Sequence, residues 1–100
     1  MESNKQIGQI THNSKTQRFE ITLEVNGKNY TGYISYKLQG DNIVYDHTIV
    51  PKELGGRGIG SALVKHALEF AQAKNKKVVP QCWFVEKYIS RHEEYQNLLA

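Results

Sequence analysis

Four glycines fall within the six residues Gly55-Gly-Arg-Gly-Ile-Gly60, and this segment is the part of the sequence best suited to chemistry. It lies between an apolar run at 43–50 and a helical pattern at about 59–74. Glycines let the backbone turn tightly and let a ligand approach closely. The first N–H groups of the following helix have no intrahelical partners and carry the positive end of its dipole. The sequence therefore predicts an anion site, most often a phosphate site, against the simpler interpretation of a plain connector.

Two common phosphate motifs do not fit this segment. A nucleoside-triphosphate loop requires a lysine before the Ser or Thr, whereas Gly60 is followed directly by Ser61 and Ala62. A dinucleotide fingerprint requires G-x-G-x-x-G and a chain long enough for repeated strand–helix–strand units. Gly56, Gly58 and Ser61 match that spacing poorly, so another phosphate-bearing ligand is expected.

Length and composition indicate one small globular domain covering residues 1–100. The apolar fraction is 39%, and the formal net charge of +3 is mild. Lysines cluster at Lys74, Lys76 and Lys77, but acidic residues are spread through the rest of the chain. This balance favours a small anionic ligand over nucleic acid, for which a stronger basic stripe is expected.

The expected setting is the cytoplasm, with no membrane partner. Cys82 is the single cysteine, so the chain cannot form an internal disulfide, which fits a reducing compartment. No apolar run approaches the roughly 18 residues that a membrane helix needs, and the first residues lack a signal-peptide core.

The elements that must position the glycine segment follow from periodicity and turn residues. Residues 1–5 look frayed, and Asn26-Gly27 is a strong signal for a type I′ hairpin. The predicted strands cover residues 7–12, 17–25, 28–38 and 43–50. Short turns between them imply an antiparallel four-stranded meander.

The second half of the chain predicts helices around one further strand. Apolar residues at helical spacing predict a helix at about 59–74, which Asn75 should end. Residues 77–80 form a short strand, expected parallel to 43–50 because a helix connects them. A second helix at about 83–91 and a last short helix near Tyr95 should follow. The fold class is α+β.

With these elements in place, the chain resembles the GNAT superfamily of acetyl-coenzyme A-dependent N-acetyltransferases. The segment Gly55–Gly60 resembles that superfamily's pyrophosphate loop, R/Q-x-x-G-x-G/A. Three flanking segments resemble its very small, single-domain branch: Asp46-His47-Thr48, Val79-Pro80-Gln81-Cys82, and residues 84–95. The resemblance covers about residues 7–98. Two departures are Gly55 at the Arg or Gln position, which removes a side-chain contact, and Glu93 where a proline is common.

The resemblance implies that acetyl-coenzyme A is the cosubstrate. Its pyrophosphate would bind main-chain amides of the glycine loop, and its pantetheine arm would lie along the preceding strand like an added strand. Arg57 could contact a phosphate, and Lys65, Lys74, Lys76 and Lys77 could attract the 3′-phosphate. The implied cofactor-binding residues are Thr48, Ile49, Val50, Gly55, Gly56, Arg57, Gly58, Ile59, Gly60 and Ser61.

The resemblance also implies two catalytic residues, His47 and Cys82, both expected to face the thioester. In one mechanism an amine attacks the thioester directly and His47 acts as the base, directly or through water. In the other, Cys82 carries the acetyl group and His47 lowers its pKa. Each residue could instead be structural. Trp83, Phe84 and Tyr88 are expected in the core, with a position next to the cofactor as the alternative. No metal is expected.

Three functions are compatible with the sequence. The first is an N-acetyltransferase acting on an unidentified amine of a small molecule or a protein. The second is a non-catalytic module that binds coenzyme A, because elements that usually build the acceptor pocket are missing from so short a chain. The third, a nucleic-acid-binding domain using Tyr30, Tyr33 and Tyr36, rests only on the basic pI of about 9.0.

Overall fold

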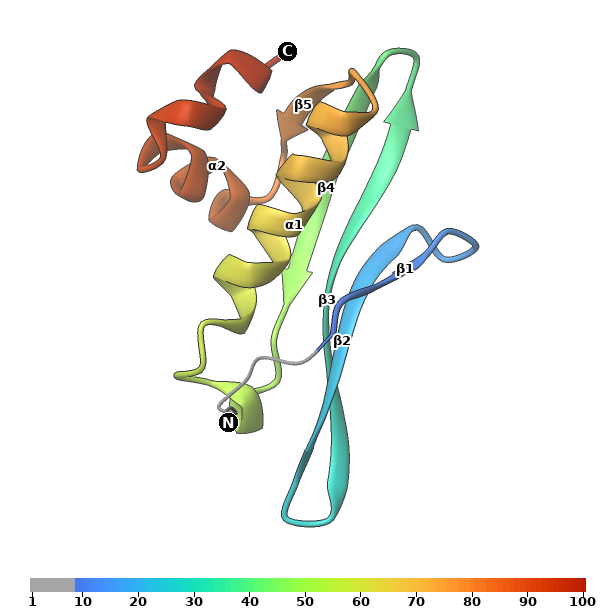
Figure 1. The fold of residues 1–100 in the computed structure, drawn as a ribbon, viewed down its shortest axis with the longest axis vertical. Helices are drawn as coiled ribbons and strands as arrows, with labels where there is room; N and C mark the ends of the chain where they lie inside the picture. Colours follow the sequence, from blue (N-terminus) through green and yellow to red (C-terminus); the bar gives the residue numbers. More distant parts are fainter. Residues whose placement is uncertain (1–8) are drawn as a thin grey trace.

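The chain folds into one five-stranded sheet with helices packed against it (Figure 1). The computed structural model describes residues 9–100, so the fraying expected for residues 1–5 lies outside the described part. Spatial strand order follows the sequence. The elements are β1 (Thr11–Asn13), β2 (Arg18–Val25), β3 (Lys28–Gln39), β4 (Asn42–Ile49), η1 (Lys52–Leu54), α1 (Ile59–Ala73), β5 (Lys77–Pro80), α2 (Trp83–Ser90) and η2 (Glu93–Leu98).

This architecture confirms the predicted α+β fold. Strands β1 to β4 pair antiparallel in sequence order, which is the predicted meander, and β5 pairs parallel to β4. Asn26 and Gly27 both have positive φ, 53° and 83°, as a type I′ turn requires. The first strand is shorter than predicted: it begins at Thr11, while residues 7 and 8 lie outside the described range.

The core lies between one face of the sheet and α1. Alternate residues of β2 and β3 point toward the helix, and Phe19, Ile21 and Ile34 are at most 1% exposed. On α1, residues Leu63 and Ala67, one turn apart, are fully buried. Figure 1 shows α1 crossing the sheet, with α2 and η2 packed beside it near β5. One face of the sheet therefore carries all the described helices.

The end of α1 follows the predicted stop. Asn75 has a φ of 55°, in the left-handed region that often follows a helix. Its N–H donates to the Gln72 carbonyl oxygen, and the Lys76 N–H donates to the Ala71 carbonyl oxygen, at 3.1 and 2.9 Å. This pair of bonds is a Schellman motif, which satisfies the last carbonyl groups and fixes where β5 begins.

Strand β4 contains an irregularity that the sequence did not predict. Ser35 pairs with His47, but the next residue, Tyr36, pairs with Tyr45, so Asp46 is an extra residue in β4. The extra residue shifts the alternation of side chains beyond it. The Tyr45 side chain points toward α1, where its hydroxyl donates to the Ala67 carbonyl oxygen at 2.6 Å. Because of the bulge, the next side chain of β4 that points to this side of the sheet is that of Thr48.

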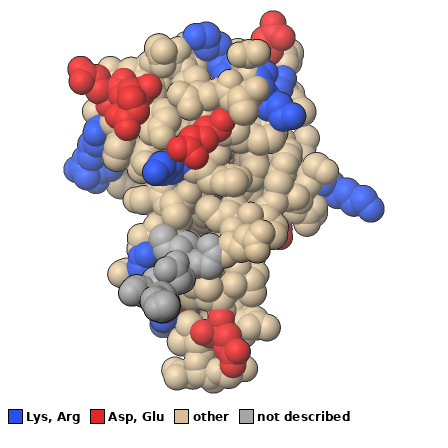
Figure 2. Space-filling view, viewed as in Figure 1, with Lys and Arg blue, Asp and Glu red and all other residues tan. Residues whose placement is uncertain are grey.

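Surface charge does not collect into one patch on the face shown in Figure 2. Lysine and arginine side chains are interspersed with aspartate and glutamate over the helical end of the molecule. Such a mixture differs from the basic stripe that nucleic-acid binding favours. Among residues 9–100, no helix combines the length and the apolar composition needed to cross a bilayer.

Candidate functional site

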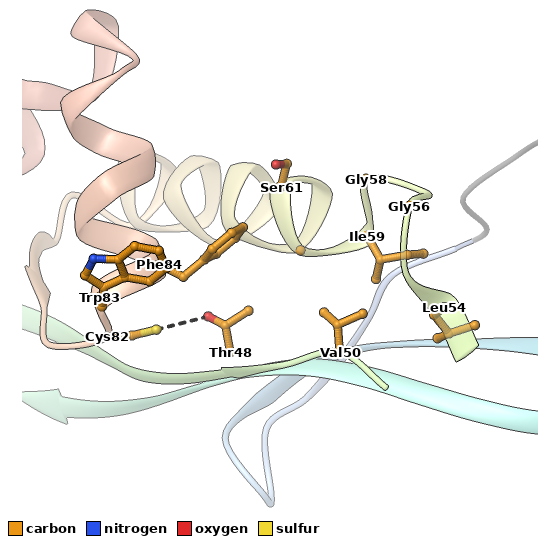
Figure 3. A pocket seen from close by; sticks show the side chains of 11 residues that line it. Thr48, Val50, Leu54, Gly56, Gly58, Ile59, Ser61, Cys82, Trp83 and Phe84 are labelled. Atoms are coloured by element: carbon orange, nitrogen blue, oxygen red, sulfur yellow. Dashed lines mark hydrogen bonds between the residues drawn. The ribbon is translucent and has the colours of Figure 1, made fainter. Parts of the chain in front are cut away.

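A cavity of about 470 Å³ opens between the end of β4, the start of α1 and the start of α2 (Figure 3). Its wall is mostly apolar, and its polar groups come from two hydroxyls, one thiol, the indole N–H of Trp83 and the main chain. The lining residues are Thr48, Val50, Leu54, Gly56, Gly58, Ile59, Gly60, Ser61, Cys82, Trp83 and Phe84. The end of β4 and the glycine loop are neighbours in the sequence, and the cavity brings them together with the start of α2, which lies further along the chain.

Each glycine of the loop that lines the cavity has a physical reason to be glycine. Gly56 and Gly58 have φ of 76° and 74°, a conformation that is costly for other residues. Gly60 has ordinary helical geometry, but a Cβ there would lie 3.0 Å from Cζ of Phe84. Two glycines therefore allow the turn, and the third allows α2 to approach the first turn of α1.

The first turn of α1 presents unpaired donors toward the cavity. The first bond within the helix runs from the Ala62 N–H to the Gly58 carbonyl oxygen at 3.0 Å. The N–H groups of Ile59, Gly60 and Ser61 precede it and have no intrahelical acceptor. Within residues 9–100, no side chain caps this terminus, and its first turn carries no carboxylate. The terminus can accept an anion, as the glycine pattern predicted.

The edge of β4 next to the cavity is open. Strand β5 pairs only with Asn42–Tyr45, and the chain then leaves the sheet. The Ile49 carbonyl oxygen faces β3, because it lies 3.3 Å from where a Cβ on Gly32 would sit. Main-chain groups alternate in direction along a strand, so those of Thr48 and Val50 face the open edge. A linear amide ligand could pair there as an added strand.

The structure separates the two residues expected to form the catalytic pair. Cys82 lines the cavity, and its thiol donates to the Thr48 hydroxyl at 3.5 Å, drawn as a dashed line in Figure 3. His47 is exposed and does not line the cavity. Since neighbouring strand residues point to opposite faces, and Thr48 points into the cavity, His47 points to the open face of the sheet. The expectation that both residues face one cleft is not met.

Three other predicted site residues lie outside the cavity wall. The Ile49 side chain is 47% exposed and, like His47, is next to an inward-facing residue. Gly55 ends η1, where its N–H donates to the Lys52 carbonyl oxygen, and Arg57 is exposed at the tip of the loop. Of the loop residues that we expected to bind the cofactor, the cavity wall contains Gly56, Gly58, Ile59, Gly60 and Ser61.

The structure adds Leu54 to the site, and it places Trp83 and Phe84, which the sequence assigned mainly to the core, in the cavity wall. Leu54 is fully buried and forms the base of the cavity wall beside the loop. The expectation that Trp83 is a core residue is wrong, because this side chain is 66% exposed at the mouth of the cavity. The buried side of α2 is formed by Val85 and Ile89, and at 3.6 residues per turn Trp83 lies about 200° around the helix from Val85, away from the core. Phe84 and Tyr88 are half-buried.

The lysines proposed to attract a 3′-phosphate are poorly placed for the loop. Lys74, Lys76 and Lys77 follow the C-terminal end of α1, whose 15 residues span about 22 Å. Two of them are engaged there: Lys76 Nζ donates to the Gly40 carbonyl oxygen and Lys77 Nζ to that of Asn97. Lys65 is exposed near the start of α1 but lines none of the cavity.

The residues whose pKa is shifted most clearly lie outside this cavity. Partial burial lowers the pKa of His12, which contacts the Tyr36 hydroxyl at 2.7 Å, and His66 and Lys74 lower it further. Burial strongly raises the pKa of Tyr45. Neither residue lines the cavity. Within residues 9–100, no three His, Cys, Asp or Glu side chains gather as a metal site would require.

Comparison with known proteins gives one consistent result. Residues 18–98 match the GCN5-related N-acetyl-transferase family. The chain is 34% identical to Protein NATD1 of Gallus gallus over 91 residues, covering 90% of this chain and 81% of that protein. For Protein NATD1 of Homo sapiens the identity is 32% over 90 residues, with 89% and 78% covered.

A solved structure shows the same fold. The solution structure of a GCN5-like protein from Staphylococcus aureus superimposes with a TM-score of 0.72 at 28% identity. The match covers 94% of this chain and 89% of that one.

Proposed function

The chain belongs to the GCN5-related N-acetyltransferase family, and from that premise we propose that it binds acetyl-coenzyme A in the cavity and transfers the acetyl group to an amine. Residues 1–100 would act as one domain, and the cytoplasm, where acetyl-coenzyme A is available, would be its setting. The acceptor is an amine of a small molecule or a protein.

One observation carries this proposal: a phosphate-type helix terminus and an open strand edge lie on the same cavity. The free N–H groups at Ile59, Gly60 and Ser61 suit a pyrophosphate. The main-chain groups of Thr48 and Val50 suit the amides of pantetheine. Acetyl-coenzyme A carries both features in this order, with its thioester at the far end, which would lie near Cys82.

The geometry favours direct transfer over an acetyl-cysteine intermediate. The thiol of Cys82 has the Thr48 hydroxyl as its hydrogen-bonding partner, and a hydroxyl is a weak base. His47, on the opposite face of β4, is not placed to take the Cys82 proton. It is placed on the open face, from which an amine could approach a thioester held between β4 and β5.

In the direct reaction the amine nitrogen attacks the thioester carbonyl carbon. The tetrahedral intermediate collapses with cleavage of the carbon–sulfur bond, so the products are an amide and the thiol of coenzyme A. The amine loses one proton, which His47 accepts directly or through water, and the departing thiolate gains one from solvent. The extra residue at Asp46 leaves a main-chain amide of β4 without a sheet partner, and this amide could polarise the thioester carbonyl.

A second function, binding of coenzyme A without turnover, is favoured by the composition of the cavity wall. None of its lining residues is a carboxylate, histidine, lysine or arginine, so no strong base lies inside it. The protein would then hold an acyl-coenzyme A and leave chemistry to a partner. The two functions differ in whether His47 matters.

Turnover and intermediate formation can be measured together. Wild type, Cys82→Ala and His47→Gln are mixed with acetyl-coenzyme A and a panel of amines, including histone-like and N-terminal peptides. Free thiol is followed with a chromogenic disulfide, and the intact protein mass is recorded. We expect thiol release with wild type and Cys82→Ala, a loss with His47→Gln, and no acetyl group left on Cys82.

Each alternative has its own result. Acetylation of wild type but not of Cys82→Ala would replace direct transfer by the cysteine mechanism. Binding of acetyl-coenzyme A by all three proteins without thiol release with any amine would favour the binding module. Absence of binding would remove the coenzyme A proposal and leave the glycine loop as a connector.

A further inference from the structure

A second, smaller cavity of about 160 Å³ adjoins the first between α1 and α2. The two cavities share three lining residues, Ser61, Trp83 and Phe84, which the close-up in Figure 3 places together at the start of the two helices. Ser61 is in the first turn of α1, next to the free amides. A ligand whose anionic centre binds those amides can therefore continue into the second cavity.

The floor of this second cavity is aromatic. Phe84, Tyr88 and His92 lie at i, i+4 and i+8, on one side of α2 and its C-terminal extension. The rings of Tyr88 and His92 are stacked, with centroids 3.9 Å apart and planes 10° from parallel. His92 Nδ1 lies 2.8 Å from the Tyr88 carbonyl oxygen. Since a carbonyl only accepts, Nδ1 is the donor, and this bond fixes the ring.

The rim of the second cavity is basic. Trp83, Lys87 and Arg91 occupy a neighbouring row of α2 at the same i, i+4, i+8 spacing. Lys87 Nζ lies 4.8 Å from the centroid of the Trp83 ring, so the ammonium group is held over the exposed indole. Glu69 and Glu94 approach Tyr88 closely enough to affect its titration, but neither lines the cavity.

From this arrangement we infer that Lys87 and Arg91 bind the 3′-phosphate of coenzyme A, with the exposed face of Trp83 against its adenosine. The inference rests on the proposed function and extends it to the nucleotide end of the ligand. A phosphate monoester carries nearly two negative charges, which suits two cations on one rim. Arginine can bind it bidentately, and an indole can stack on a purine. Lys87 and Arg91 thus become the candidate residues for the 3′-phosphate, in place of the lysines that follow the C-terminal end of α1.

The test compares coenzyme A with 3′-dephospho-coenzyme A, which differ only in the phosphate concerned. Affinities are measured by titration calorimetry for wild type, Lys87→Gln, Arg91→Gln and the double variant. For wild type we expect coenzyme A to bind about tenfold more tightly than the dephospho form, because two partly exposed charge pairs each contribute modestly. The affinity of the double variant for coenzyme A should fall by about this factor, whereas its affinity for the dephospho form should be almost unchanged.

Lys74→Gln is the matched control, because it removes one positive charge from the far end of α1. We expect it to bind both ligands as wild type does. Unchanged affinity of the dephospho form in all variants also shows that they remain folded. If wild type binds both ligands equally, or if Lys74→Gln and the double variant lose the same factor, the 3′-phosphate site is refuted while the proposed function stands. If neither ligand binds wild type, both fail.

Discussion

Replacement of Gly60 by alanine tests how closely the two helices must approach at the site. A Cβ on Gly60 would lie 3.0 and 3.1 Å from Cζ and Cε2 of Phe84, and 3.8 Å from Cγ2 of Val50. Non-bonded carbon atoms prefer about 3.5–4.0 Å, so the Phe84 ring must move by several tenths of an ångström. The ring is part of the wall of both cavities, so its movement changes the space in which we propose that coenzyme A binds.

Two opposing energies set the size of the effect on stability. Overpacking costs about 1–3 kcal/mol in a core, and the rim position of Phe84 places this case at the lower end. Alanine gains about 1 kcal/mol over glycine within a helix. The net change in the free energy of unfolding is therefore expected between about 0 and 2 kcal/mol of destabilisation. Affinity for coenzyme A should fall about tenfold, equal to about 1.4 kcal/mol.

The assay pairs urea unfolding with calorimetric titration of coenzyme A. Gly60→Ala is compared with Phe84→Leu and with the double variant, in which the smaller side chain leaves room for the new methyl group. We expect the double variant to bind more tightly than Gly60→Ala alone. Wild-type affinity in Gly60→Ala, or equal loss in the single and double variants, would refute the steric explanation for this glycine.

Three further predictions concern stability. Gly58→Ala should cost about 1–2 kcal/mol because of the positive φ, and Gly58→Asn should cost less because asparagine tolerates that region; urea midpoints distinguish the two. Because the folded pKa of His12 lies below its ordinary value, the unfolded chain binds a proton first as pH falls, so stability should decline from neutral to mildly acidic pH. His12→Gln should show a weaker decline over the same range, and an equal decline would remove His12 as the cause. Tyr45→Phe deletes the buried bond to the Ala67 carbonyl oxygen and should cost about 1 kcal/mol in thermal or urea unfolding.

Much of the fold could be predicted because local signals and the final structure agree. Asn26-Gly27 requires the positive φ values that the structure shows, and Asn75 ends α1 in the same conformation. The strand before the glycine loop and the helix after it have bounds within one residue of those predicted. Each of these signals depends only on residues that are close together in the sequence, and turns and helix ends are determined by such local interactions.

The separation of His47 from Cys82 could not be predicted because it depends on one extra residue in β4. Strict alternation along β4 would point the side chains of Tyr45 and His47 to the same side, toward α1. Because of the bulge at Asp46, the Thr48 side chain points to that side and the His47 side chain points to the other. The bulge arises from pairing with β3, which no local pattern in β4 reveals. The prediction of a core position for Trp83 was wrong because helical spacing alone did not show that Val85 and Ile89, and not Trp83, occupy the buried side of α2.

The most direct test of the central claim is a titration of the nitrogen-labelled protein with acetyl-coenzyme A, followed by amide chemical shifts. We expect large, saturable shifts at Thr48 and Val50, at 56–61 and at 82–84, with 3′-phosphate-dependent shifts at Lys87 and Arg91. Saturable shifts confined to the opposite end of α1, at 72–77, or no shifts at millimolar ligand, would contradict the claim that this cavity is the coenzyme A site.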